Sequence, residues 1–340
     1  MLQQLTARIK QSLGQRREAR AAARARDEEV RLAIEHVVDE INPKLRAVSN
    51  YRKKLRQPVE RALAFSKEIV ASVPGPVAVN RTAWSSDPMV RAFFAGVEDM
   101  RQVLSRNDEV HDYFAVGKSA QQPCYALLNM QRSERTVLGV EGSGDIIKRD
   151  VLQTSVSFKD RKVVKPAASE AQLRQELEQR AFEVLVTYVL ERITAMIADR
   201  HSLKETQLLQ DMQLRLAQVK QASLSSLLED RDAGAEDLDA LLQQQQHTTQ
   251  AFEQASARLL TLDDYIDRIT EVLGHPAEHF KARHITMRLS QMNIKRDEQA
   301  PGAANDLELT ELLLGDEIRR IVLTITFPRD ELVAKQRLFQ

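Results

Sequence analysis

The stretch VRLAIEHVVDEINPKLRAV, residues 30–48, decides the fold class, because its apolar side chains recur at spacings of three and four. Spacing of this kind predicts helices that pack along their length against other helices. Pro43, directly after Asn42, and Pro58 interrupt the pattern, so we expect bends in one long rod. The apolar stripe runs on to residue 73 and consists of Val30, Ile34, Val37, Ile41, Leu45, Val48, Leu55, Val59, Ala62, Ile69 and Val73.

Two later segments, residues 122–165 and 285–327, change to an alternating pattern that is typical of half-buried strands. In the first segment one face would carry Cys124, Ala126, Leu128 and Met130, and in the second Ile321, Leu323, Ile325 and Phe327. The predicted fold class is therefore mainly α with small antiparallel β-sheets (α+β). Long heptad-patterned helices and helical hairpins would be accompanied by two short β-meanders.

The two halves of the chain repeat the same order of elements, with long helices, a short helix and then a meander. The turns before the last strands are also similar, since residues 144–149 read GDIIKR and residues 315–320 read GDEIRR. We interpret this as an internal duplication, with chance similarity between two hairpins as the alternative. The predicted domains are a basic amphipathic helix (1–29), a helical rod with the first meander (30–166), and a long helical hairpin with the second meander (167–340).

The predicted hairpin consists of two narrow apolar seams separated by the polar sequence DRDAG, residues 230–234. Gln245 and Thr248 take seam positions in its second helix, where polar layers commonly fix the register. These seams would pair within the chain or between subunits, which makes them the predicted interaction surface. Its residues are Leu209, Met212, Leu216, Val219, Leu238, Leu241, Phe252 and Leu259.

The N-terminal segment has the pattern of a basic amphipathic helix. Its apolar stripe consists of Leu2, Leu5, Ile9 and Leu13, and its surrounding cations include Arg8, Lys10, Arg16, Arg17, Arg20 and Arg24. Such a helix can lie on an anionic membrane surface, dock on an acidic partner or nucleic acid, or act as an organelle-targeting segment. The simpler interpretation is that it begins the first long helix, with solvated arginines on its faces.

Charge, cysteine usage and hydropathy limit the class of protein. Lys and Arg total 49, as do Asp and Glu, so a wholly basic nucleic-acid-binding surface is not expected. A local patch remains an alternative, in which Arg52, Lys53, Lys54 and Arg56 would join the N-terminal arginines as a nucleic-acid footprint. The one cysteine, Cys124, is expected to be a core residue in a reducing compartment. Without an apolar run of about 20 residues or a signal-peptide core, the predicted localisation is cytoplasmic, at most peripheral to a membrane.

One sequence string suggests metal chemistry. His275, Glu278 and His279 fit the His-x-x-Glu-His pattern of one zinc peptidase class. The string follows a helix-ending glycine, contains a proline, and has no evident third ligand, so a zinc-dependent hydrolase is the least favoured alternative. We therefore predict a non-enzymatic coiled-coil scaffold that binds protein partners or itself, with no catalytic residue, cofactor or metal.

Overall fold

The computed structural model describes residues 2–115, 122–143, 146–228, 235–257, 261–296, 303–315 and 318–333. Among these, the side chains of residues 2–19, 140–149, 217–239, 252 and 254–257 are left undescribed. The described chain is α+β and divides into two compact units, of which unit 1 comprises 1–62 and 184–275, and unit 2 comprises 63–183 and 276–340. Each unit combines two separate stretches of chain, whereas the sequence analysis divided the chain into consecutive ranges.

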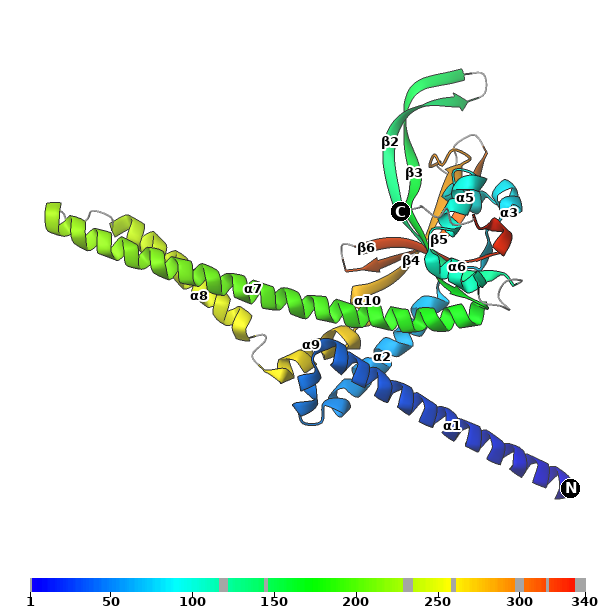
Figure 1. Ribbon diagram of the computed structural model, residues 1–340, viewed down its shortest axis with the longest axis horizontal. Helices are drawn as coiled ribbons and strands as arrows, with labels where there is room; N and C mark the ends of the chain where they lie inside the picture. Colours follow the sequence, from blue (N-terminus) through cyan, green and yellow to red (C-terminus); the bar gives the residue numbers. More distant parts are fainter. Residues whose placement is uncertain are drawn as a thin grey trace. The chain divides into compact units, whose positions relative to one another are not determined.

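Unit 1 is helical (Figure 1). Its elements are α1 (Leu2–Ile41), the 3₁₀ helix η1 (Pro43–Ala47), the first part of α2 (Tyr51–Ala71), the second part of α7 (Glu170–Leu228), α8 (Ala235–Ala257) and α9 (Leu262–Gly274). A capping box at Thr261 begins α9, in which the Thr261 hydroxyl and the Asp264 carboxylate each accept a backbone N–H of the other residue.

The chain reverses direction between α1 and α2, so the prediction of one long bent rod is wrong. Asn42 caps η1 by accepting the Lys44 N–H at 3.0 Å, and Asn50 has a left-handed φ of 57° just before α2. These two features fold α2 back beside α1, where ion pairs join Asp27 to Arg56. The apolar stripe itself is buried as predicted, except that Ile41 is only half-buried.

Unit 2 contains a six-stranded sheet and several short helices. The helices are α3 (Arg81–Ser86), α4 (Pro88–Phe93), α5 (Val97–Leu104), α6 (Asp108–Ala115) and α10 (Pro276–His279), with the 3₁₀ helix η3 (Arg329–Glu331). The strands are β1 (Val77–Ala78), β2 (Cys124–Ser143), β3 (Ile146–Ala167), β4 (Phe280–Ser290), β5 (Ala304–Leu314) and β6 (Ile318–Phe327).

The two predicted meanders form one sheet, so the expectation of two separate small sheets is wrong. The strand order is β3-β2-β6-β5-β4, and the junction is the antiparallel pairing of Cys124–Met130 with Phe327–Ile321. Two separate meanders would each leave an unpaired edge, and pairing β2 with β6 removes one edge from each. The short strand β1 runs parallel to the end of β6.

One face of this sheet and the short helices enclose a single apolar core. Cys124, Ala126, Leu128 and Met130 of β2 all lie in this core, as the alternation predicts. Helices α4, α5 and α6, together with Phe94 directly after α4, contribute aromatic and aliphatic residues, and those of the helices are Val90, Phe93, Met100, Val103, Leu104, Val110 and Phe114. Toward the end of β6, Gly75 approaches Thr324 so closely that a β-carbon would lie 2.2 Å from its hydroxyl oxygen.

Candidate interaction surfaces

The α7–α8 hairpin exists (Figure 1). Polar side chains join its two helices. Gln207 donates to the Thr249 hydroxyl at 3.3 Å, and Gln245 donates to Asp211. Gln210 and Thr248 are buried, at 7% and 8% exposure. Gln245 therefore faces α7, and its partner there is the Asp211 carboxylate.

The apolar residues of α7 in this region are exposed. Leu208, Leu209, Met212 and Leu216 have exposures of 62%, 61%, 60% and 56%. At 3.6 residues per turn, these four residues lie on the opposite side of α7 from Gln207, Gln210 and Asp211. We call them the α7 stripe.

The structure therefore does not bring Leu209, Met212 or Leu216, the predicted α7 seam residues with described side chains, against α8. Leu209, Met212 and Leu216 belong to the α7 stripe, whereas Leu241 of α8 is half-buried. The side chains of Val219, Leu238 and Phe252, and residue 259, lie outside the described part of the chain.

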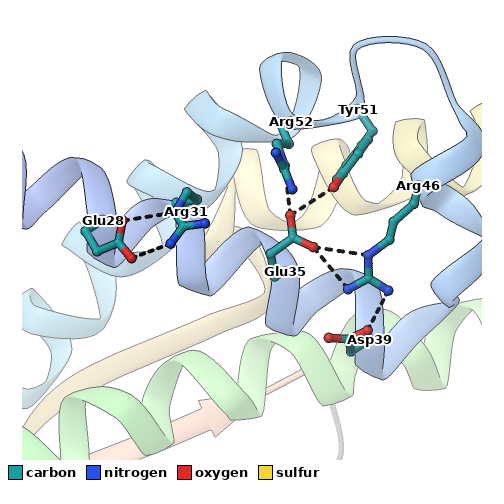
Figure 2. A network of polar contacts seen from close by, with 7 residues as sticks. All are labelled: Glu28, Arg31, Glu35, Asp39, Arg46, Tyr51 and Arg52. Carbon is teal, nitrogen blue, oxygen red and sulfur yellow. Dashed lines mark hydrogen bonds and ion pairs between the residues drawn. The ribbon is translucent and has the colours of Figure 1, made fainter.

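Glu35 of α1 is the centre of a polar network that holds α1, η1 and α2 together (Figure 2). Its carboxylate accepts hydrogen bonds from Tyr51 at 2.9 Å, from Arg52 at 2.8 Å and from Arg46 at 3.0 Å. Arg46 also pairs with Asp39 at 2.7 Å. Burial raises the pKa of Glu35, but the three hydrogen bonds together outweigh it and hold the pKa below its ordinary value.

A lowered pKa of Glu35 makes the stability of the α1–α2 hairpin depend on pH. The ionised Glu35 carboxylate contributes to the free energy of unfolding above its unfolded-state pKa of about 4. This contribution is lost as the pH falls through the lower folded-state pKa. Glu35→Gln should therefore lower the urea midpoint at neutral pH and have a shrinking effect below about pH 4. Glu40→Gln, at an exposed position on the same helix, is the matched control. Equal effects of the two variants would contradict this role of Glu35.

A groove of about 650 Å³ lies beside this network, between α1 and α2. Cations from two distant stretches of sequence line it together, since Arg24 and Arg31 come from α1 and Arg52, Lys53 and Arg56 from α2. The remaining lining residues are Asp27, Glu28, Val30 and Ile34. The structure therefore unites part of the N-terminal basic segment with most of the second basic cluster. Lys54 lies apart from the groove lining and pairs with Asp263.

The predicted N-terminal binding helix forms the start of α1, which runs without a break from Leu2 to Ile41. Arg20 and Arg24 are exposed on it. The side chains of the other predicted binding residues lie outside the described part of the chain, and these are Leu2, Leu5, Arg8, Ile9, Lys10, Leu13, Arg16 and Arg17. The N-terminal segment is therefore helical, and its apolar residues can line up on one side only in a helix.

The predicted zinc candidates gain no support. His275 closes α9 in unit 1, whereas Glu278 and His279 lie in α10 of unit 2. Across the described residues, no group of three His, Cys, Asp or Glu side chains is placed to hold a metal ion. Cys124 is buried as expected, and burial raises the pKa of its thiol to about 12, which disfavours the nucleophilic thiolate.

Buried ion pairs in unit 2 were not predicted from the sequence. Glu331 is 6% exposed, accepts the Arg81 N–H at 3.0 Å and lies near the Arg101 guanidinium. Glu311, 3% exposed, pairs with Arg132 at 3.3 Å. Both join distant segments of one unit, and we assign them structural roles.

No protein-family model, curated protein or solved structure matches the chain. Among the helices of the described residues, none is both long enough and apolar enough to cross a bilayer.

Proposed function

We propose that this chain is a non-enzymatic interaction protein that self-associates through the α7 stripe. One observation carries the proposal: four large apolar side chains, each more than half exposed, lie together on one side of a long helix. Contiguous apolar patches on a soluble protein commonly mark contact sites. The partner helix would pack in the manner of a coiled coil, since Leu209, Met212 and Leu216 follow heptad spacing.

The symmetry of the stripe favours a second copy of the chain as the partner. Leu208 and Leu216 each lie four residues from Met212, on opposite sides. An antiparallel copy would therefore set Leu208 against Leu216 of the second molecule and Met212 against itself. Self-complementary twofold contacts of this type are the commonest way in which identical subunits associate.

Sedimentation equilibrium of the full chain tests this proposal. We expect a reversible shift from monomer to dimer over micromolar concentrations. Specific helix pairing would be detectable up to about millimolar concentration. If the chain stays monomeric over this range, the α7 stripe binds a different protein or has no partner, and self-association is contradicted.

We also propose that the start of α1 tethers the assembly to an anionic surface. Its helical state supports this, because the apolar stripe of Leu2, Leu5, Ile9 and Leu13 exists only on a helix. Deleting residues 2–19, which spares the groove, should strongly reduce co-sedimentation with vesicles containing anionic lipid. Full-length protein and the deletion variant would bind alike if the segment were only the beginning of a structural helix.

The similar turns at 144–149 and 315–320 are our ground for an internal duplication. In this proposal the hairpins β2–β3 and β5–β6 are the two copies, and their joining in one sheet fits a repeated unit.

A further inference from the structure

We propose that the groove between α1 and α2 binds a run of phosphates, as in a single-stranded nucleic acid or inorganic polyphosphate. The site is independent of the α7 stripe and needs no second molecule. It is built from residues of unit 1 alone.

The groove carries an excess of positive charge although the chain is neutral. Five cationic side chains line it with two carboxylates, and two further carboxylates, Glu35 and Glu60, pair with lining arginines, so the excess lies at Arg24 and Lys53. Clefts lined by one sign of charge concentrate the field and attract counter-ions of the opposite sign. A polyanion is the ligand that this field selects.

The carboxylates hold several of the arginines in place. Arg31 pairs with Glu28, Arg52 pairs with Glu35 at 2.8 Å, and Arg56 pairs with Glu60 at 2.9 Å as well as with Asp27. Arg24 and Lys53, by contrast, have no ion-pair partner within the described residues. These two cations are therefore available to bind an incoming anion through charge-assisted hydrogen bonds.

The groove presents no exposed aliphatic residue on which an amphipathic partner helix could pack, among the residues that are described as lining it. Its two apolar residues, Val30 and Ile34, are only 3% and 4% exposed. Four of its five cations are arginines, whose planar forks match the geometry of phosphate oxygens. Among the described residues no aromatic side chain lines it, so bases would have no stacking platform and binding would follow the backbone without sequence preference.

The cationic surface is long enough for several phosphates. Arg20, Arg24 and Arg31 lie within about 40° of one another around α1. At a rise of about 1.5 Å per residue, Arg20 and Arg31 are separated by about 16 Å along the helix. Arg20 thus extends the groove toward the N-terminus.

Fluorescence anisotropy with a labelled single-stranded oligothymidylate, and competition by inorganic polyphosphate, test the proposal. The groove variant is Arg24→Glu with Lys53→Glu. The matched control is Arg26→Glu with Lys44→Glu, which makes the same charge change at exposed positions outside the groove. In low salt we expect the groove variant to bind at least about tenfold more weakly and the control to stay within about threefold. Because the groove variant removes two phosphate contacts, the slope of the logarithm of the binding constant against the logarithm of the salt concentration should become shallower by about 1.4.

The competition experiment distinguishes the two sources of phosphate. If polyphosphate displaces the oligonucleotide, the ligand is the phosphate chain itself. If the oligonucleotide binds and polyphosphate does not displace it, the ligand is nucleic acid. Both assignments require that the groove variant weakens binding. The proposal is overturned if neither ligand binds in low salt or if both double variants lose binding equally. It is also overturned if polyglutamate of equal charge competes as well as polyphosphate.

Discussion

Met212→Glu should weaken self-association of the chain by at least about a hundredfold. Met212 is 60% exposed in the isolated chain, so the substitution leaves the fold of the monomer intact. In an antiparallel pair the two substituted positions would face one another, and two carboxylates would replace an apolar contact. Lost burial of about 1.5–3 kcal/mol per side chain, together with like-charge repulsion, accounts for the expected loss. Sedimentation equilibrium measures it.

Gln213→Glu is the matched control for this variant, since it adds the same charge at the neighbouring exposed position. We expect it to change the dimer dissociation constant only a few-fold. Circular dichroism of both variants should equal that of the wild type, because neither position faces α8. Equal loss of association in the two variants would point to a general charge effect and contradict a contact centred on Met212.

The second large effect is expected inside unit 2, at Arg161 of β3. Its guanidinium donates to the Phe93 carbonyl oxygen at 2.7 Å and to both Asp99 carboxylate oxygens, at 2.6 and 2.9 Å. It also lies over the Phe94 ring. Arg161→Ala removes all of these contacts and leaves Asp99 without its cation, so we expect a loss of about 2–3 kcal/mol in the free energy of unfolding. Urea denaturation measures this loss.

The neighbouring residue provides the control for Arg161. Lys162 is 55% exposed and pairs with an exposed Asp160, so Lys162→Ala should leave the stability nearly unchanged. Burial raises the pKa of Asp99, but hydrogen bonds from Arg161 and the Ala95 N–H outweigh it and hold the pKa below its ordinary value. The stability that this provides is present at neutral pH and lost as the pH falls below about 4. The difference between Arg161→Ala and wild type should therefore shrink in acid, and a pH-independent difference would contradict the assigned pairing.

Periodicity predicted burial well wherever helices or strands pack by apolar contact. The stripe from Val30 to Val73 and the face of β2 are buried almost as expected. The single sheet was missed, although β6 contained a signal for it. The consecutive apolar residues Ile321, Val322 and Leu323 are all buried, and an unbroken apolar run is typical of a central strand covered on both faces.

On α7 the periodicity of the apolar residues left open whether the same chain or a second molecule covers the stripe. The leucines indicated a seam, and the actual contact with α8 uses Gln207, Asp211 and Gln245. The groove between α1 and α2 could not be predicted either, because it forms only where the chain reverses direction. Asn42-Pro43 predicted a break, but only the folded structure shows that α2 returns beside α1 and brings Lys53 to the groove that Arg24 lines.

Distances between spin labels test the antiparallel pairing of the α7 stripe most directly. Single nitroxides would be placed at position 213 or 201 after Cys124→Ala, so that each dimer carries one pair of labels. The proposed pairing predicts a short distance at position 213 and, since residue 201 lies eleven residues from Met212, a separation of about 33 Å along the helices at position 201. Equally short distances at both positions, or no dipolar coupling at either, would contradict it.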